Sequence, residues 1–94
     1  MGELVRVHMI ISGRVQGVFF RANTKSKAQS LNLSGCVRNL PDGSVEVVAE
    51  GPHDTLADFV RWCHKGPAAA RVDSVDIEWE LATGELTQFG IRDW

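Results

Sequence analysis

The sequence predicts an α+β sandwich in which two helices cover one face of a β-sheet. Several segments alternate apolar and polar side chains, which is typical of half-buried strands. Two other segments repeat apolar side chains at helical spacing. These segments follow one another in the order strand, helix, strand, strand, helix, strand, with one more short strand at the end.

The first strand and the first helix are separated by a loop that contains glycine. Residues 3–12 alternate apolar and polar side chains and predict a strand. Residues 13–21 begin with a glycine and contain a second one, which predicts a structured loop. From about Phe20 the pattern becomes helical, and apolar side chains return on one face as far as Leu31. Gly35 is expected to end this helix.

The middle of the chain predicts a β-hairpin. Residues 36–40 form a short second strand, and the turn-forming residues Pro, Asp, Gly and Ser occupy positions 41–44. Residues 44–50 alternate again and form the third strand. Gly51 and Pro52 are expected to end it.

The last third of the chain predicts one helix and two strands. Apolar side chains recur at helical spacing between Leu56 and Cys63, and this amphipathic helix ends at Gly66. Residues 72–81 form a long strand whose acidic side chains are interpreted as a solvated face, and residues 89–92 form a closing strand. The order corresponds to two split βαβ units. It predicts a ferredoxin-like βαββαβ sandwich, with an antiparallel sheet, two helices on one face and a short extra C-terminal strand.

Length and charge indicate a single domain over residues 1–94. Ten Lys and Arg stand against twelve Asp and Glu. This balance argues against a nucleic-acid binder, which needs excess basic side chains to displace counterions from phosphates. No apolar run approaches the roughly 20 residues of a membrane-spanning helix, and no targeting segment is recognisable. We therefore expect a cytoplasmic monomer without membrane or nucleic-acid partners.

The cysteines, histidines and aromatic residues are given structural interpretations. Cys36 and Cys63 are far apart in the sequence and are expected to be free thiols. The three histidines are scattered without further ligands at suitable spacing, so no metal site is expected. Four aromatic side chains are interpreted as core residues: Phe19, Phe20, Phe59 and Trp79.

The predicted topology brings two separate segments together at one edge of the sheet. In a split βαβ unit the first two strands run parallel, so the second strand ends beside the start of the first helix. Val37 and Asn39 share a strand face, and the apolar Val37 indicates that this face lies under the helices. Asn39 is therefore expected to lie beside the loop 13–21.

That loop has the composition of an anion-binding site. A glycine-containing loop that leads into a helix points unpaired backbone N–H groups at one spot, and the helix dipole adds positive charge there. Arg14 and Arg21 bracket the loop, and a guanidinium binds phosphate oxygens in bidentate fashion. The same residues also fit an ordinary tight turn with surface arginines. Residue types alone leave both interpretations open.

Two motifs resemble the signatures of the acylphosphatase family. The first is Gly13-Arg14-Val15-Gln16-Gly17-Val18-Phe19-Phe20-Arg21, and the second is Gly35-Cys36-Val37-Arg38-Asn39 followed by Pro41-Asp42-Gly43-Ser44-Val45. Gly66-Pro67, Ala70-Arg71-Val72 and Phe89-Gly90-Ile91-Arg92 resemble later landmarks of that family. The resemblance covers nearly the whole chain in order. Cys36 stands where the family commonly has an aromatic residue; strand alternation points it away from Asn39, so we expect changed packing and no lost chemistry.

The resemblance implies an acylphosphatase that works without a metal ion or cofactor. Such an enzyme hydrolyses the carboxyl–phosphate bond of a small acyl phosphate to a carboxylate and inorganic phosphate, which is also an inhibitor. Arg21 would be the catalytic phosphate-binding arginine, and Asn39 would hold the attacking water. The phosphate would be cradled by the backbone amides of Val15, Gln16, Gly17, Val18, Phe19 and Phe20.

The motifs also bear on the proton transfer and the substrate. Neither residues 13–21 nor residues 35–39 contain a His, Asp or Glu that could act as a general base, so a phosphate oxygen of the substrate would accept the proton of the water. Carbamoyl phosphate and 1,3-bisphosphoglycerate are candidate substrates by resemblance to the family.

Three other functions use or could use the same fold: RNA recognition, metal transfer and non-catalytic anion binding. An RNA-recognition module shares the element order, but the predicted third strand has no aromatic residue on which a base could stack. A metallochaperone would need a CxxC motif in the first loop, and the loop has none. A non-catalytic phosphate- or anion-binding regulatory domain is the main alternative. The presence of both Arg21 and Asn39 favours an enzyme.

Overall fold

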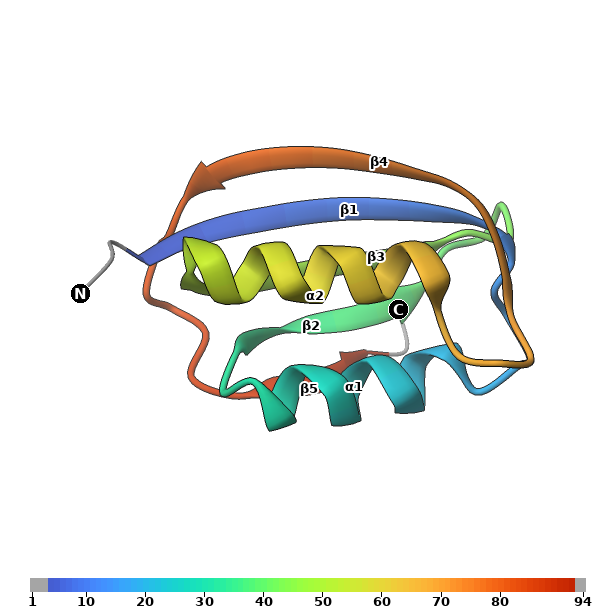
Figure 1. The fold of residues 1–94 in the computed structure, drawn as a ribbon, viewed down its shortest axis with the longest axis horizontal. Helices are drawn as coiled ribbons and strands as arrows, with labels where there is room; N and C mark the ends of the chain where they lie inside the picture. The colour runs from blue at the N-terminus through green and yellow to red at the C-terminus, as the bar shows by residue number, and fades with distance from the viewer. Residues whose placement is uncertain (1–3, 93–94) are drawn as a thin grey trace.

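The protein was analysed as a computed structural model that describes residues 4–92. Position 3, the predicted start of the first strand, lies outside the described residues. Figure 1 shows the elements in chain order: β1 (Leu4–Arg14), α1 (Phe20–Ser30), β2 (Ser34–Asn39), β3 (Val45–Pro52), α2 (His53–Lys65), β4 (Arg71–Leu81) and β5 (Phe89–Arg92).

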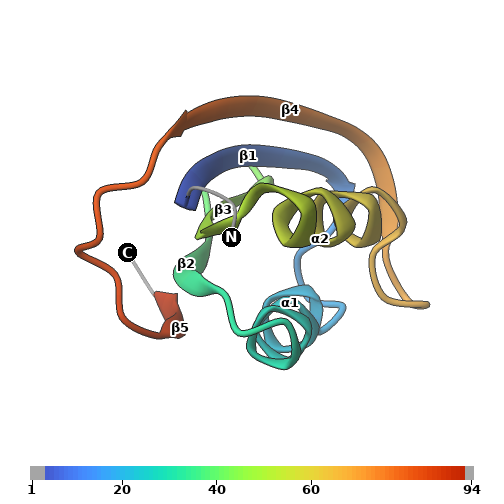
Figure 2. The same ribbon diagram turned by 60° about the vertical axis from the view of Figure 1, so that its left-hand side comes forward.

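The strands form one twisted sheet in the order β4-β1-β3-β2-β5. Both helices lie on its concave face, as the two views in Figures 1 and 2 show. Strands β1 and β2 each pair antiparallel with β3, so they run parallel to one another, as predicted for a split βαβ unit. The ferredoxin-like βαββαβ arrangement is confirmed.

The pairing of β5 differs from the antiparallel sheet that was predicted. β5 runs parallel to β2, at the opposite edge of the sheet from β4. The direction follows from the topology: β4 is antiparallel to β1, and the chain reverses once more before it reaches β5. β5 therefore has the direction of β1 and β2, which makes the sheet mixed.

The core lies between the sheet and the two helices. Val7, Met9 and Ile11 alternate along β1 and are completely buried, as are Phe59 of α2 and Ala28 of α1. Burying an aliphatic or aromatic side chain of this size contributes about 1.5–3 kcal/mol. This packing fixes both helices on the sheet and so fixes the position of the segments at their ends.

Several predicted element boundaries differ from the structure by one or more residues, and three of the differences have a clear local reason. Strand β1 continues past Ser12 to Arg14, because residues 13 and 14 still pair with β4 after a shift in register. Strand β3 continues through Pro52, because residues 51 and 52 pair with the start of β1. Helix α1 ends at Ser30 and not at Gly35. Asn32 adopts the left-handed backbone there, with φ 57°, since Asn tolerates this conformation better than most residues.

Gly35 has a different role from the predicted one. It lies inside β2, with φ 149°, and a Cβ at this position would collide with the backbone carbonyl of Val48 on β3. Gly35 is therefore needed for the close approach of two strand backbones.

The assignment of the four aromatic residues to the core is half correct. Phe20 and Phe59 are buried, as predicted. Phe19 is 78% exposed and Trp79 is 45% exposed, so for these two the prediction is wrong. Trp79 lies on the edge strand β4, where α2 covers the sheet incompletely, and its ring stacks on that of His53 with centroids 4.8 Å apart.

Two further expectations concern the thiols and the membrane. Cys36 and Cys63 are both free thiols, as predicted. Cys63 is buried in the core, and this burial raises the pKa of its thiol. Within residues 4–92, neither helix has the length and apolar character needed to cross a bilayer.

Candidate active site

A loop of five residues connects β1 to α1 and carries the first half of the site. Two of its residues have a left-handed backbone, Gly17 with φ 74° and Phe19 with φ 61°. Phe19 is the N-cap of α1, but its side chain makes no capping hydrogen bond, and the first turn of this fully described helix has no acidic residue. The positive end of α1 is thus left uncompensated by its own side chains, which suits an anion.

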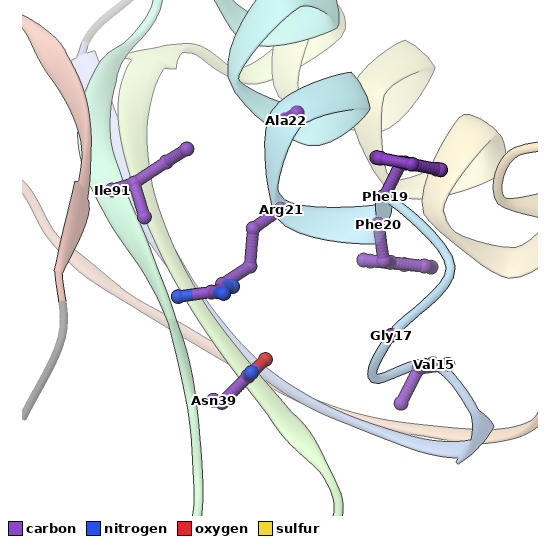
Figure 3. A pocket seen from close by; sticks show the side chains of 8 residues that line it. All are labelled: Val15, Gly17, Phe19, Phe20, Arg21, Ala22, Asn39 and Ile91. Atoms are coloured by element: carbon purple, nitrogen blue, oxygen red, sulfur yellow. The ribbon is translucent and has the colours of Figure 1, made fainter.

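The loop, the start of α1 and the end of β2 enclose a cavity of about 400 Å³. Figure 3 shows its lining, which consists of Val15, Gly17, Phe19, Phe20, Arg21, Ala22, Asn39 and Ile91. Arg21 comes from the first turn of α1 and Asn39 from the last position of β2. The Arg21 guanidinium and the Asn39 carboxamide both reach into the space between these two elements. The expectation that Asn39 lies beside the loop 13–21 is confirmed.

The carboxamide of Asn39 has an unused hydrogen-bond acceptor. Its Oδ1 atom is buried and has no hydrogen-bond partner in the described part of the chain. A buried acceptor without a partner costs about 1–3 kcal/mol. Val37, two positions earlier on the same strand face, is fully buried and holds this part of β2 against the core. The unpaired oxygen is therefore fixed in place and available to a donor that enters the cavity.

The side chains of Gln16 and Val18 do not line this cavity. Val18 is 8% exposed and belongs to the core. The Gln16 Nε2 atom donates to the backbone carbonyls of Leu40, at 2.8 Å, and Ser44, at 2.9 Å. Gln16 thereby joins the loop to the turn that follows Asn39. The sequence analysis gave Gln16 only a backbone role and missed this link, although Gln16 is the one polar side chain among residues 15–20 and was a signal for it.

The turn between β2 and β3 is itself held by a carboxylate. Asp42 accepts hydrogen bonds from the hydroxyl and the backbone N–H of Ser44, and these bonds lower the pKa of Asp42. The Leu40 N–H donates to the Ser44 carbonyl at 2.9 Å. Side-chain and backbone hydrogen bonds therefore both hold the turn that supports Asn39.

Two other residues lie away from the cavity, and two lining residues, Ala22 and Ile91, were not foreseen. Cys36 is on the opposite face of the sheet, beside Arg6 and His8, as strand alternation predicted. Arg14 is an exposed residue at the end of β1 and is not among the lining residues. Ile91 lines the cavity because β5 pairs with β2, and nothing in the sequence reveals that pairing. Among residues 4–92, no three His, Cys, Asp or Glu side chains are grouped so that they could hold a metal ion.

The comparisons with known proteins are consistent in sequence and in structure. A family model described as Acylphosphatase matches residues 7–91. A protein named Acylphosphatase from Rubrobacter xylanophilus is 53% identical over 87 residues, which cover 93% of this chain and 79% of that protein. One of the same name from Anaeromyxobacter dehalogenans is 49% identical over 92 residues, covering 98% of this chain and 99% of that protein.

Two solved structures are similar along nearly their whole length. An acylphosphatase from Bacillus subtilis superposes with a TM-score of 0.90 at 33% identity, covering 94% of this chain and 98% of that one. An acylphosphatase from Coxiella burnetii has a TM-score of 0.89 at 39% identity, covering 96% of this chain and 94% of that one.

Proposed function

The chain belongs to the acylphosphatase family and is an enzyme that hydrolyses acyl phosphates, and we propose that it does so in the cavity between α1 and β2. The substrate phosphate sits against the backbone N–H groups of residues 15–20, at the uncompensated positive end of α1. Arg21 grips two of its oxygens and neutralises their charge. The carboxyl–phosphate bond then projects out of the cradle.

Asn39 holds the attacking water in this proposal. Its buried, unpaired Oδ1 accepts a hydrogen bond from the water and aims the water oxygen at phosphorus. This unsatisfied acceptor beside the Arg21 guanidinium is the observation that carries the proposal. It is the group that a bound water would satisfy, and it lies next to the group that would hold the phosphate.

The chemistry needs little more than position and charge. A bond forms between the water oxygen and phosphorus while the bond from phosphorus to the carboxyl oxygen breaks, and the carboxylate leaves with the electron pair. The water proton passes to a non-bridging phosphate oxygen, so the products are a carboxylate and inorganic phosphate. Because a carboxylate is a good leaving group and the transition state is loose, no acid or base from the protein is required.

A hydrolysis assay with benzoyl phosphate tests this proposal. We expect turnover in buffer containing EDTA, and a fall in turnover of about 10²–10³-fold in Asn39→Ala, the usual effect of removing one transition-state contact. Asn32→Gly is the matched control, since it removes a carboxamide outside the cavity where the left-handed backbone suits glycine. It should keep wild-type turnover.

The outcomes separate the main proposal from its alternative. Full turnover by a folded Asn39→Ala variant would mean that another group holds the water. Phosphate binding without turnover by the folded wild type would instead favour a non-catalytic anion-binding regulatory domain.

We also propose that the protein is a cytoplasmic monomer of one domain. A free thiol that is partly accessible, Cys36, suits a reducing compartment. One continuous core joins the sheet to both helices, which supports a single domain. Light scattering of the purified protein tests the oligomeric state, and a mass of twice the 10.4 kDa chain would contradict it.

A further inference from the structure

Phe19 combines two features that are seldom found in one residue. Its aromatic side chain is 78% exposed, and its backbone adopts a left-handed φ of 61°. This conformation is rare for a bulky residue and strains the backbone, and such residues cluster at ligand sites. Core packing does not explain the arrangement, because the adjacent Phe20 fills the core and is 1% exposed. The loop thus holds an apolar ring out toward solvent at some cost in stability.

The exposed ring lies at the cavity of the proposed active site. Phe19 is one of the residues that line this cavity. In Figure 3 its ring lies beside the start of α1, across the cavity from Asn39, and the Arg21 guanidinium lies close to Asn39. The apolar Ile91 also lines the cavity, but from β5, on the side of the neighbouring strand β2 that carries Asn39. Phe19 and Ile91 therefore lie on different sides of the Arg21 side chain.

The geometry of phosphoryl transfer distinguishes these two sides. The attacking and leaving oxygens are roughly in line through phosphorus. A water held at Asn39 therefore requires the carboxyl oxygen to leave on the far side of the phosphate, away from β2 and toward Phe19. The acyl group of the substrate would extend over the exposed ring, where apolar area is available for it.

We propose that the ring of Phe19 binds the acyl group of the substrate and selects apolar, ring-sized acyl groups over small or polar ones. The inference rests on the proposed function of this cavity, in particular on the water at Asn39. An aromatic acyl group would stack on the ring or meet it edge to face. A small acyl group such as acetyl is too short to cover the ring and gains little from it.

The test compares two substrates that share the phosphate and differ in the acyl group. The ratio of kcat/KM for benzoyl phosphate to kcat/KM for acetyl phosphate is measured for the wild type, Phe19→Ala and Phe19→Gly. We expect the ratio to fall about fivefold in both variants, which corresponds to the loss of one aromatic contact. Most of the loss should be in KM for benzoyl phosphate. Because Phe19→Gly also relieves the left-handed backbone, agreement between the variants assigns the loss to the ring.

Ile91→Ala is the matched control within the same cavity. It removes an exposed apolar side chain on the Asn39 side, so the substrate ratio should stay at the wild-type value. An unchanged ratio in Phe19→Ala and Phe19→Gly would overturn the inference and leave the proposed function intact. An equal fall in Ile91→Ala would also overturn it, since the acyl group would then lie on the wrong side. No turnover of either substrate by the wild type would overturn the proposed function itself, and the inference with it.

Discussion

Arg21 and Asn39 have separate roles in the proposed reaction, so their variants should fail in different ways. Arg21→Ala removes the charged group that grips the phosphate, and it should weaken both phosphate inhibition and turnover by at least about 10²-fold. Arg21→Lys keeps a positive charge but loses the bidentate geometry. It should therefore recover only part of the phosphate inhibition and part of the turnover. Inhibition by inorganic phosphate is the measurement. Near-normal inhibition of Arg21→Ala would remove this side chain from its assigned role.

The position of a single residue could be predicted from the sequence where topology or a regular apolar pattern constrained it. Asn39 was placed beside the loop because strand direction and the buried Val37 together fix its face. The exposure of Phe19 could not be foreseen, because the sequence pattern predicts that two adjacent aromatic residues are both buried in the core. It depends on the left-handed φ at the helix start, which turns this side chain out while Phe20 points in. A left-handed φ at a single residue cannot be predicted from the spacing of apolar residues.

At the scale of elements, the link between the loop and the hairpin turn is the feature most open to test. Gln16→Ala removes two hydrogen bonds and leaves the carbonyls of Leu40 and Ser44 without this donor. We expect a loss of about 1–3 kcal/mol in the free energy of unfolding, measured in urea. Turnover should fall as well, since the turn sets the position of Asn39 relative to the cradle. Unchanged stability and turnover would show that the turn holds its place without Gln16.

The elements themselves were predictable where the hydrophobic period was long, and less so at their ends. The pattern identified every helix and strand in order, because burial on one face forces a period of two or of about 3.6 residues. The end of α1 was misplaced because Asn32 and Gly35 both suit a helix terminus, and only the contact of β2 with β3 shows what Gly35 is for. The pairing of β5 with β2 could not be predicted either, because the alternation of side chains over only four residues does not specify a neighbouring strand.

At the scale of the whole molecule, one buried carboxylate ties the sheet to the segment that crosses to its far edge. Glu50 of β3 is 5% exposed and accepts hydrogen bonds from the N–H groups of Thr83 and Gly84, at 2.9 and 3.1 Å. It also accepts from the Thr83 hydroxyl and lies 3.5 Å from Arg6 Nη1. Thr83 and Gly84 follow β4 and begin the connection to β5. Glu50 therefore fixes the path by which β5 reaches β2.

This carboxylate should make stability depend on pH in the acidic range. Burial alone would raise the pKa of Glu50, but the hydrogen bonds from Thr83 and Gly84 and the charge of Arg6 outweigh burial and lower it. A lowered pKa in the folded state means that the stabilisation is complete above the ordinary Glu pKa of about 4.3 and is lost as pH falls below it. Glu46 has a lowered pKa as well, through His8 and Arg38, and adds to this loss.

Urea unfolding of wild type and Glu50→Gln at several pH values tests this assignment. At pH 7 we expect Glu50→Gln to be less stable by about 2–4 kcal/mol, because the amide cannot satisfy the same donors and Arg6 loses its partner. The difference should shrink as pH falls below the ordinary Glu pKa of about 4.3, because the unfolded chain takes up a proton there before the folded carboxylate does. Glu85→Gln, an exposed neighbour on the same connection, is the control and should follow the wild type throughout. A difference that stays constant down to pH 3 would mean that Glu50 acts through its shape and packing, and that its charge does not hold the connection to β5.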